Sequence, residues 1–352
     1  MTRLAGDAIG STVSLQPLAL RGRGTRLLSS MLEGVAPITK AFIYNDNIDF
    51  FRSLDVLVVA EKTSLVLKFG YKLEKLKIVH TRHGAGDRAI GFNSESAAFD
   101  HVLVSGPKIR ERLIQDAGVE PARVSIVGYP KFDLPATPAI HSTVDGERPV
   151  VLYNPHVSPH LSSWYKMGRA VLDWFVEHDE YQLIFAPHVM LFERSFAISI
   201  DKLRVDRPGR IDEKYLRAPN IHIDLGSRAS TTMAYTNRAD IYVGDVSSQV
   251  YEFLRQPRPC LFLDAHQTAW EGNPNYAHWA AGPVVRNVEW LGEALRSARA
   301  THMAEFEPVQ RRLFRYSFDL TDRPSSERAA EVVARVAGLD WPHQDQPIHR
   351  YG

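Results

Sequence analysis

The chain has 352 residues, enough for two domains that each bury a hydrophobic core. Its 42 Lys and Arg residues against 41 Asp and Glu residues leave a net charge of +1, so no overall positive charge draws it to nucleic acid. The single cysteine, Cys260, excludes an internal disulfide and a cysteine-ligated zinc site, which favours a reducing compartment such as the cytoplasm.

The N-terminal segment lacks the uninterrupted apolar stretch of a signal peptide, and no apolar run approaches the ~20 residues needed to span a bilayer. Three arginines, Arg21, Arg23 and Arg26, precede an amphipathic pattern. The pattern favours an ordinary packed helix, but such a segment could also lie on a membrane surface. The sequence therefore predicts a cytoplasmic protein and leaves a peripheral membrane contact open.

From residue 54 onward, short β-branched runs alternate with helical patterns, which is typical of parallel βα units. Lys108–Gly118 has helical spacing and ends in a glycine suited to a C-cap. Leu134–Pro149 is rich in proline and small polar residues and is predicted to be a linker. We expect a first domain at 1–138, with strands in "LDVLVVAE", "LKIVHTRHG", "FDHVLVSGP" and "VSIVGYP".

A second βα series follows the linker. A helix after Ser163 is well marked, because Trp164, Met167 and Val171 fall on one face. We expect a second domain at 139–340 and a tail at 341–352. Its strands lie in "PVVLYNPHV", "YQLIFAPHV", "PNIHIDLG", "ADIYVGDVSS", "PRPCLFLDA" and "GPVV". Two such α/β domains imply a cleft, and ligands of open α/β sheets bind beyond the carboxyl ends of the strands.

Histidines follow three of the predicted strands: His83, His156 and His188. A histidine held at a strand end can take or give a proton near neutral pH. Any one of them could be structural, but three equivalent positions favour chemistry. A metal site is not expected, because Pro159 interrupts the helix that His156 and His160 would need and no third ligand is evident.

The segment "GDVSSQVYEFL" places Asp245 and two serines between a strand and a helix that begins near Gln249. The N–H groups of the first helical turn, with the hydroxyls of Ser247 and Ser248, predict a binding site for a diphosphate. Glu252 could accept hydrogen bonds from ribose hydroxyls. Ser248 could equally cap the helix, and the two roles are compatible.

The segment Thr81–Arg88, "TRHGAGDR", has the outline G-x-G-x-x-A of a dinucleotide-binding turn. That fingerprint needs an acidic residue ~20 positions later, at the end of the next strand. The next strand ends at Ser105 without a carboxylate, so a nicotinamide or flavin cofactor is not expected. Gly84 and Gly86 more simply allow a sharp turn beside His83 and a close approach of substrate.

The ordered motifs "HGAG", "GYPKFD", "VLYNPH", "APH", "DVSSQVYEFLRQPRPCLFLD" and "SSERAAEVV" resemble the CDP-glycerol glycerophosphotransferase family over roughly residues 75 to 340. That family builds teichoic-acid-like and capsular polymers. The resemblance implies an α/β GT-B-like fold of two Rossmann-like domains, closed by a C-terminal helix. Ala85, Val189 and Val246 depart from the residues usual in the family, so the transferred group stays open.

The resemblance implies a transferase that moves glycerol phosphate, or a related polyol phosphate, from a CDP-activated donor to a hydroxyl of a glycan or lipid-linked polymer. The transfer reaction that the resemblance implies requires no metal or further cofactor. His83 matches the general base and His188 a histidine beside the donor diphosphate. The donor nucleotide and diphosphate would contact Asn154, His156, Asp245, Ser247, Ser248 and Glu252. An acceptor-side loop would comprise Gly84, Gly86, Asp87 and Arg88.

Three alternatives remain. A GT-B glycosyltransferase of surface polysaccharide synthesis would use a nucleotide sugar at the same site. A UDP-sugar 2-epimerase shares the architecture, but its paired carboxylates and histidine-arginine-rich turn are not found in this sequence. A nucleotide- or glycan-binding protein without catalytic activity is the third, and the intact His83 and His188 argue against it.

Overall fold

The computed structural model describes residues 43–82, 84–135, 148–193, 197–199 and 204–341, which form two compact units. The first unit comprises the described parts of Met1–His83, Phe92–Leu134 and Phe318–Gly352. The second unit comprises those of Gly84–Gly91 and Pro135–Ser317. Several sequence predictions fall outside the described residues: the segment with Arg21, Arg23 and Arg26, the residue His83, the boundary at 138 and most of the tail.

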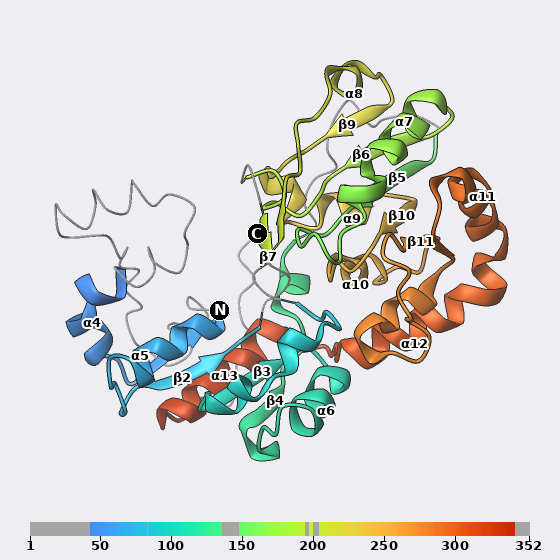
Figure 1. Ribbon diagram of the computed structural model, residues 1–352. Helices are drawn as coiled ribbons and strands as arrows, with labels where there is room; N and C mark the ends of the chain where they lie inside the picture. Colours follow the sequence, from blue (N-terminus) through green and yellow to red (C-terminus); the bar gives the residue numbers. More distant parts are fainter. Residues whose placement is uncertain (1–42, 83, 136–147, 194–196, 200–203, 342–352) are drawn as a thin grey trace. The chain divides into compact units, whose positions relative to one another are not determined.

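A four-stranded sheet forms the centre of the first unit, in the order β1-β2-β3-β4 (Figure 1). All neighbouring strands are parallel, with Leu57 opposite Ile78 in the first pair. These are the four strands predicted for this half of the chain. Their bounds are β1 Val56–Val59, β2 Lys77–His80, β3 His101–Val104 and β4 Val124–Ile126.

Both faces of this sheet are covered. Because successive side chains of a strand point to opposite faces, Ile78 and Val79 enter two different apolar clusters. Ile78 packs in the cluster that includes Leu113 of α6, and Val79 packs in the cluster that includes Val332 of α13. The helices are α4 Ile48–Arg52, α5 Val66–Phe69, α6 Pro107–Gln115 and α13 Ser325–Ala337.

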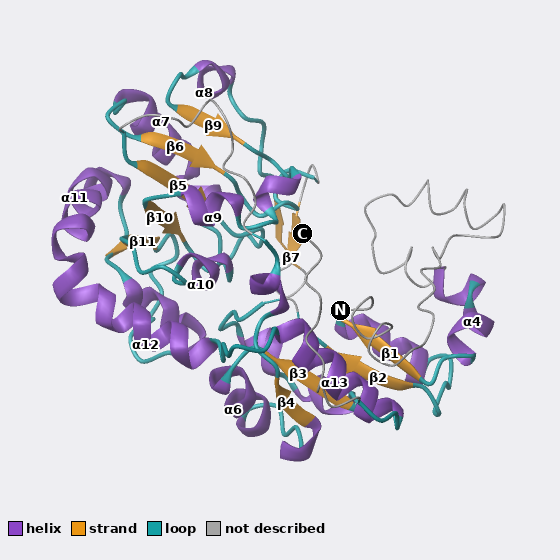
Figure 2. Ribbon diagram, turned by 180° about the vertical axis from the view of Figure 1, so that it is seen from behind, coloured by secondary structure: helices purple, strands orange, loops and turns teal. Residues whose placement is uncertain are grey.

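The C-terminal helix α13 belongs to the first unit, although the sequence assigned it to the second domain (Figures 1 and 2). Its small apolar face, with Ala329 and Val332, packs on Val79 and Leu103 of the first sheet. The helix ends at Gly338, whose φ of 75° is the left-handed conformation expected of a glycine C-cap.

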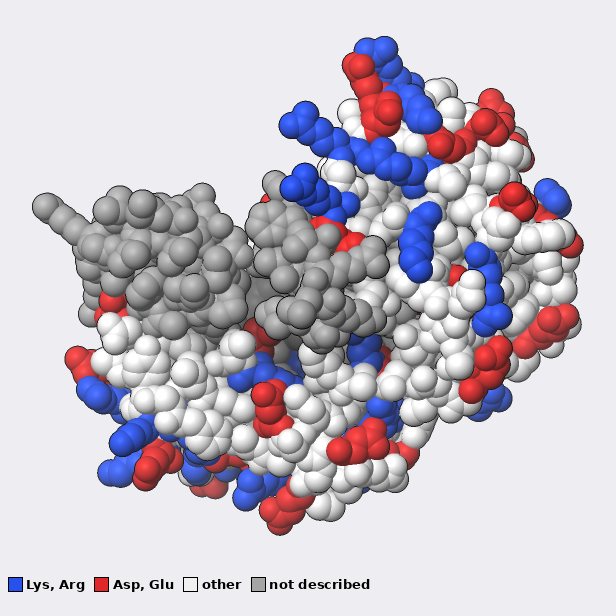
Figure 3. All heavy atoms as spheres, in the orientation of Figure 1, with Lys and Arg blue, Asp and Glu red and all other residues white. Residues whose placement is uncertain are grey.

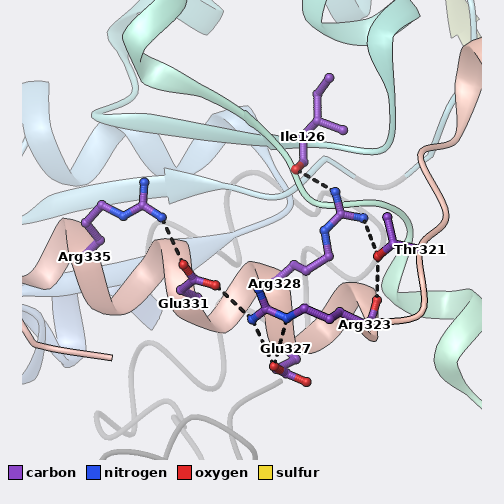
Figure 4. Close-up of polar contacts among 7 residues, drawn as sticks. All are labelled: Ile126, Thr321, Arg323, Glu327, Arg328, Glu331 and Arg335. Atoms are coloured by element: carbon purple, nitrogen blue, oxygen red, sulfur yellow. Dashed lines mark hydrogen bonds and ion pairs between the residues drawn. The ribbon is translucent and has the colours of Figure 1, made fainter. Parts of the chain in front are cut away.

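The start of α13 is held by a residue far away in the sequence. The carboxylate of Asp133 accepts the backbone N–H groups of Ser325 (3.1 Å) and Ser326 (2.6 Å). Arg323, which is half exposed, pairs with the buried Glu327 and with Glu331, both at 2.9 Å (Figure 4). Pairs that involve an exposed side chain add little stability, so we expect the buried face and the Asp133 cap to contribute more to holding the helix.

A six-stranded parallel sheet, in the order β12-β11-β10-β5-β6-β9, forms the centre of the second unit. Its strands confirm those predicted for this half. They are β5 Val150–Asn154, β6 Gln182–Phe185, β9 Ile221–Ile223, β10 Ile241–Gly244, β11 Cys260–Leu263 and β12 Val284–Val285. A separate antiparallel pair joins β7 Ala197–Ser199 to β8 Arg204–Asp206.

The predicted helix after Ser163 begins with a π-helical turn, Trp164–Gly168, and continues as α7 Arg169–Glu177. The oxygen Oγ of Ser162 accepts the N–H of Trp164 at 3.1 Å. Trp164, Val171 and Phe175 pack in the core of this unit. The other helices are α8 Glu213–Arg217, α9 Ala234–Arg238, α10 Gln249–Phe253, α11 Leu291–Thr301 and α12 Glu307–Ser317.

On the face drawn in Figure 3, basic and acidic side chains of the described residues are interspersed. This mixture agrees with the net charge of +1. Across the part of the chain that the structure describes, no helix combines the length and apolarity needed to cross a membrane.

Candidate functional site

The carboxyl ends of β6, β5 and β10, three neighbouring strands, carry the polar residues that the sequence singled out. In a parallel sheet these ends meet at one edge, where ligands of α/β folds bind. His156 follows β5 and His188 follows β6, and their ring centres lie 5.8 Å apart. The structure thus brings these two predicted residues together at the strand ends of the second unit.

The side chain of Asp245, which follows β10, points into the protein and is fully buried. Its Oδ1 accepts the N–H groups of His156 (2.9 Å) and Val246 (2.6 Å). Its Oδ2 accepts the N–H (2.6 Å) and the hydroxyl (2.8 Å) of Ser163. Burial raises the pKa of this carboxyl, and the donors oppose that rise. Asp245 therefore fixes the backbone that presents His156, and a direct contact with a donor stays a prediction.

Asn154, at the end of β5, is also buried and bonds to residues of the two neighbouring chain segments, at β6 and β10. Its Nδ2 donates to the carbonyl of Ala186 at 2.6 Å. Its Oδ1 accepts the hydroxyl of Tyr242 at 3.3 Å. These contacts make Asn154 part of the frame beneath the site.

The two serines that precede α10 differ in their contacts. Ser247 Oγ accepts the N–H of Gln249 at 3.3 Å, so it is Ser247 that bonds to the first turn. Ser248 makes no capping hydrogen bond through its side chain and is partly exposed. Glu252, one turn further, is buried, and its contact with a ribose stays a prediction.

The loop Gly84–Gly91 belongs to the second unit, although the sequence assigned it to the acceptor-side domain. Its backbone lies directly on Ser248. A Cβ added at Gly84 would lie 3.1 Å from Ser248 Oγ, and one added at Gly86 would lie 3.0 Å from Ser248 Cβ. A side chain at either position would crowd Ser248, which accounts for the two glycines. The close approach of substrate expected from the sequence stays a prediction.

The guanidinium of Arg88 lies against His156, with Nη1 2.9 Å from Nε2. The N–H of Ser158 donates to His156 Nδ1, also at 2.9 Å. A neutral imidazole accepts at only one nitrogen, so two donors compete for one acceptor. Burial, assisted by Arg88, His188 and His160, holds the pKa of His156 well below its usual range. The ring is therefore neutral near pH 7.

Arg88 is partly buried, and among the described residues no carboxylate pairs with it. Partial burial lowers the pKa of its guanidinium, a sign that the charge is removed from water. Arg88, His156 and His188 form a corner of the second unit at the ends of β5 and β6. This corner combines positive charge with more hydrogen-bond donors than acceptors. An anion is the ligand that such a site would bind.

His188 completes the corner. Its backbone N–H donates to the carbonyl of Pro155 at 3.0 Å, which links the ends of β5 and β6. The N–H of Met190 donates to Nδ1 of His188 at 3.3 Å. Because Nδ1 accepts this bond, the ring proton of the neutral form lies on Nε2.

Sequence reasoning did not find two residues that hold the loop. Tyr251 of α10 and His278 both bond to the carboxylate of Asp87. They lie 164 and 191 residues further along the chain. Neither adjoins a strand end, so no local pattern marks them. Within the described ranges, no group of three or more His, Cys, Asp or Glu side chains is arranged to hold a metal ion.

No protein-family model matches this chain, and no curated protein matches it. Solved structures do. The H444N variant of the wall teichoic acid polymerase TagF has a TM-score of 0.57 at 14% identity, covering 85% of this chain and 76% of that one. The same variant soaked with CDPG has a TM-score of 0.55.

Two further solved structures are similar to the same extent. A putative UDP-N-acetylglucosamine 2-epimerase from Listeria monocytogenes has a TM-score of 0.55 at 14% identity, covering 87% of this chain and 83% of that one. MnaA of S. aureus, solved with UDP, has a TM-score of 0.53 at 14% identity, covering 96% and 87%. With the two parallel sheets and the returning C-terminal helix, these likenesses show that the chain has a GT-B-like α/β fold.

Proposed function

We propose that this protein is a GT-B transferase that moves glycerol phosphate, or a related polyol phosphate, from a CDP-activated donor to a hydroxyl of a cell-surface glycan or polymer. The observation that carries the proposal is the contact of Arg88 with His156 beside His188, at the carboxyl ends of β5 and β6. The motif resemblance and the fold shared with TagF support the choice of donor.

The diphosphate of the donor would supply the hydrogen-bond acceptors and the negative charge that the corner formed by Arg88, His156 and His188 lacks. Its oxygens only accept hydrogen bonds, and both Arg88 and the Nε2–H of His188 donate them. A guanidinium also matches two phosphate oxygens at once. Partial burial strengthens these charge–charge contacts relative to water. The hydroxyl of Ser248 lies where the loop meets α10 and would add a further donor.

In the proposed reaction, an oxygen of the acceptor hydroxyl attacks the phosphorus that carries the glycerol. The bond from that phosphorus to the oxygen bridging the two phosphates breaks, and CMP leaves with the bonding electrons. His83 takes the proton of the acceptor hydroxyl as general base. Arg88 and His188 stabilise the negative charge that develops on the departing nucleotide.

A nucleotide-sugar glycosyltransferase is the second candidate. MnaA, which shares this fold, was solved with UDP, and UDP carries the same diphosphate. At the proposed anion site a UDP-sugar would present its diphosphate to the same Arg88 and His188. The acceptor oxygen would then attack a sugar carbon, and UDP would leave.

A panel of donors separates the two candidates. Purified full-length protein is incubated with CDP-glycerol, CDP-ribitol, CMP-sugars and UDP-sugars, and released CMP or UDP is quantified. Consumption of CDP-glycerol or CDP-ribitol supports the proposal, and consumption of UDP-sugars alone replaces it with the glycosyltransferase. The His83→Ala variant should lose turnover while its affinity for CDP stays within about twofold. Full activity in that variant would show that another group is the base.

A further inference from the structure

We infer that Asp87 is a positioning residue, which holds the loop Gly84–Gly91 so that Arg88 meets His156 and thereby sets the affinity for the diphosphate of the donor. The inference rests on the proposed function for the identity of the ligand. The placement of Arg88 by Asp87 can be tested without any ligand.

Asp87 is deeply buried, with 2% of its surface exposed. Its Oδ2 accepts the hydroxyl of Tyr251 at 2.6 Å. The same oxygen faces the ring Nδ1 of His278 at 2.9 Å and the backbone N–H of His278 at 3.3 Å. A buried carboxylate with three donors is a strong and specific anchor, because each donor would lose its partner if the loop moved.

His278 connects this anchor to the frame of the site. Its Nε2 lies 2.9 Å from the carbonyl oxygen of Asp245, which also accepts the indole N–H of Trp279 at 2.7 Å. A carbonyl only accepts, so Nε2 of His278 carries a proton. Its Nδ1 faces Asp87 Oδ2. The ring therefore bridges Asp87 and Asp245 in one orientation.

These contacts form a continuous series around the proposed anion site, which comprises Arg88, His156 and His188. Asp87 bonds to His278, and His278 bonds to the carbonyl of Asp245. The carboxylate of Asp245 holds the N–H of His156 at 2.9 Å, and the ring of His156 contacts Arg88 at 2.9 Å. Arg88 follows Asp87 in the chain. The position of the guanidinium relative to His156 is therefore fixed from both sides.

If Asp87 only stabilised the fold, weakening its hydrogen bonds would lower the stability of the unit without a specific loss of ligand affinity. The glycines of the loop also rest on Ser248, so the loop has an attachment that does not depend on Asp87. Weakening the Asp87 anchor should then release Arg88 more than it unfolds the unit. Replacing Asp87 by alanine would leave buried donors unpaired and could prevent folding. The milder changes Tyr251→Phe and Asp87→Asn avoid this difficulty.

A second buried pair provides the matched control. The hydroxyl of Tyr235 donates to Asp224 Oδ2 at 2.6 Å, the same distance as in the Tyr251–Asp87 pair. Both tyrosines are buried in the second unit. Tyr235→Phe therefore removes a buried tyrosine–carboxylate hydrogen bond, together with the 3.0 Å contact of the same hydroxyl with His222 Nε2, and leaves the contacts of Asp87 in place.

The first test measures the affinity of the full-length protein for CDP and for UDP by calorimetry, together with urea unfolding. We expect Tyr251→Phe to weaken binding about threefold to tenfold and Asp87→Asn at least tenfold, with Tyr235→Phe within twofold of wild type. In an Arg88→Gln background, Tyr251→Phe should have no further effect, because Asp87 acts through Arg88. Additive losses in that double variant would overturn the inference.

The second test needs no nucleotide. The titration of His156 is followed by NMR of histidine-labelled protein, since Arg88, His188 and His160 are the charged or titratable groups that face its ring. If Asp87→Asn releases Arg88, the depressed pKa of His156 should rise. An unchanged titration in a folded variant would overturn the inference. Failure of wild-type protein to bind any nucleotide would instead overturn the proposed function and leave this second test decisive.

Discussion

Arg88 and His156 are 68 residues apart in the chain and 2.9 Å apart in the structure. The contact joins the loop after β2 to the end of β5, and both residues lie in the second unit. Arg88 Nη1 and the N–H of Ser158 both approach the ring of His156, which accepts at one nitrogen only, and no carboxylate among the described residues pairs with Arg88. An anion bound beside Arg88 would accept the surplus hydrogen bond and balance the positive charge of the guanidinium.

Arg88→Gln should therefore weaken binding of CDP about tenfold to one-hundredfold, because a hydrogen bond between charged groups contributes about 1.5–3 kcal/mol. Its free energy of unfolding should stay equal or rise, since a partly buried cation without a counterion is removed. Calorimetry and urea unfolding measure the two effects. Arg148→Gln is the control, because Arg148 precedes β5 and bonds to the carbonyl of Asp179 at 2.9 Å. Equal losses of affinity in both variants would contradict the assignment.

The two loop glycines should respond differently to changes at Ser248. The nearest atom to an added Cβ is Ser248 Oγ for Gly84 (3.1 Å) and Ser248 Cβ for Gly86 (3.0 Å). Ser248→Ala removes Oγ and keeps Cβ. It should therefore restore the stability of Gly84→Ala and leave Gly86→Ala impaired, whereas Ser248→Gly should relieve both. Thermal unfolding of the single and double variants measures this, and rescue of Gly86→Ala by Ser248→Ala would show that the loop packs differently.

Much of the fold could be predicted from the sequence because the signals are local. The strands carry β-branched runs that end in polar residues, and their parallel pairing follows from the helices between them. The grouping of His156 and His188 followed from the same logic, since both come directly after neighbouring strands.

The remainder depended on contacts distant in the sequence. The small apolar face of α13 does not say which sheet it covers, and its capping residue Asp133 lies 192 residues before Ser325. The position of the loop Gly84–Gly91 also depends on residues that are distant in the sequence. Its buried carboxylate Asp87 finds its partners in Tyr251 and His278, which no motif connects to it. The sequence places the loop in the first domain, whereas its contacts group it with the second unit.

Stability should fall as the pH is lowered below about 6.5, the usual pKa of an unfolded histidine. Burial and nearby positive charge lower the pKa of His156 in the folded state, and burial also lowers those of His101 and His266. The unfolded chain then binds protons that the folded chain does not, so unfolding becomes easier by up to about 1.4 kcal/mol per pH unit for each such histidine.

Urea unfolding between pH 7 and pH 5 should show a smaller loss for His156→Asn than for wild type, because asparagine does not titrate. Arg88→Gln should give an intermediate loss, since it removes one cause of the depressed pKa and leaves burial in place. Identical pH profiles for wild type and His156→Asn would mean that His156 keeps its usual pKa in the folded protein.

The carboxylate of Asp133 should contribute to the attachment of α13 to the first unit, alongside the buried face of the helix. Asp133 accepts the N–H groups of Ser325 and Ser326, at the helix end where a negative charge is favourable. Asp133→Ala should lower the free energy of unfolding by about 1–2 kcal/mol. Glu331→Gln is the control, because its pairs with Arg323 and Arg335 are exposed and should contribute at most about 1 kcal/mol. Urea unfolding measures both, and an equal or larger loss in Glu331→Gln would show that the exposed pairs fix the helix.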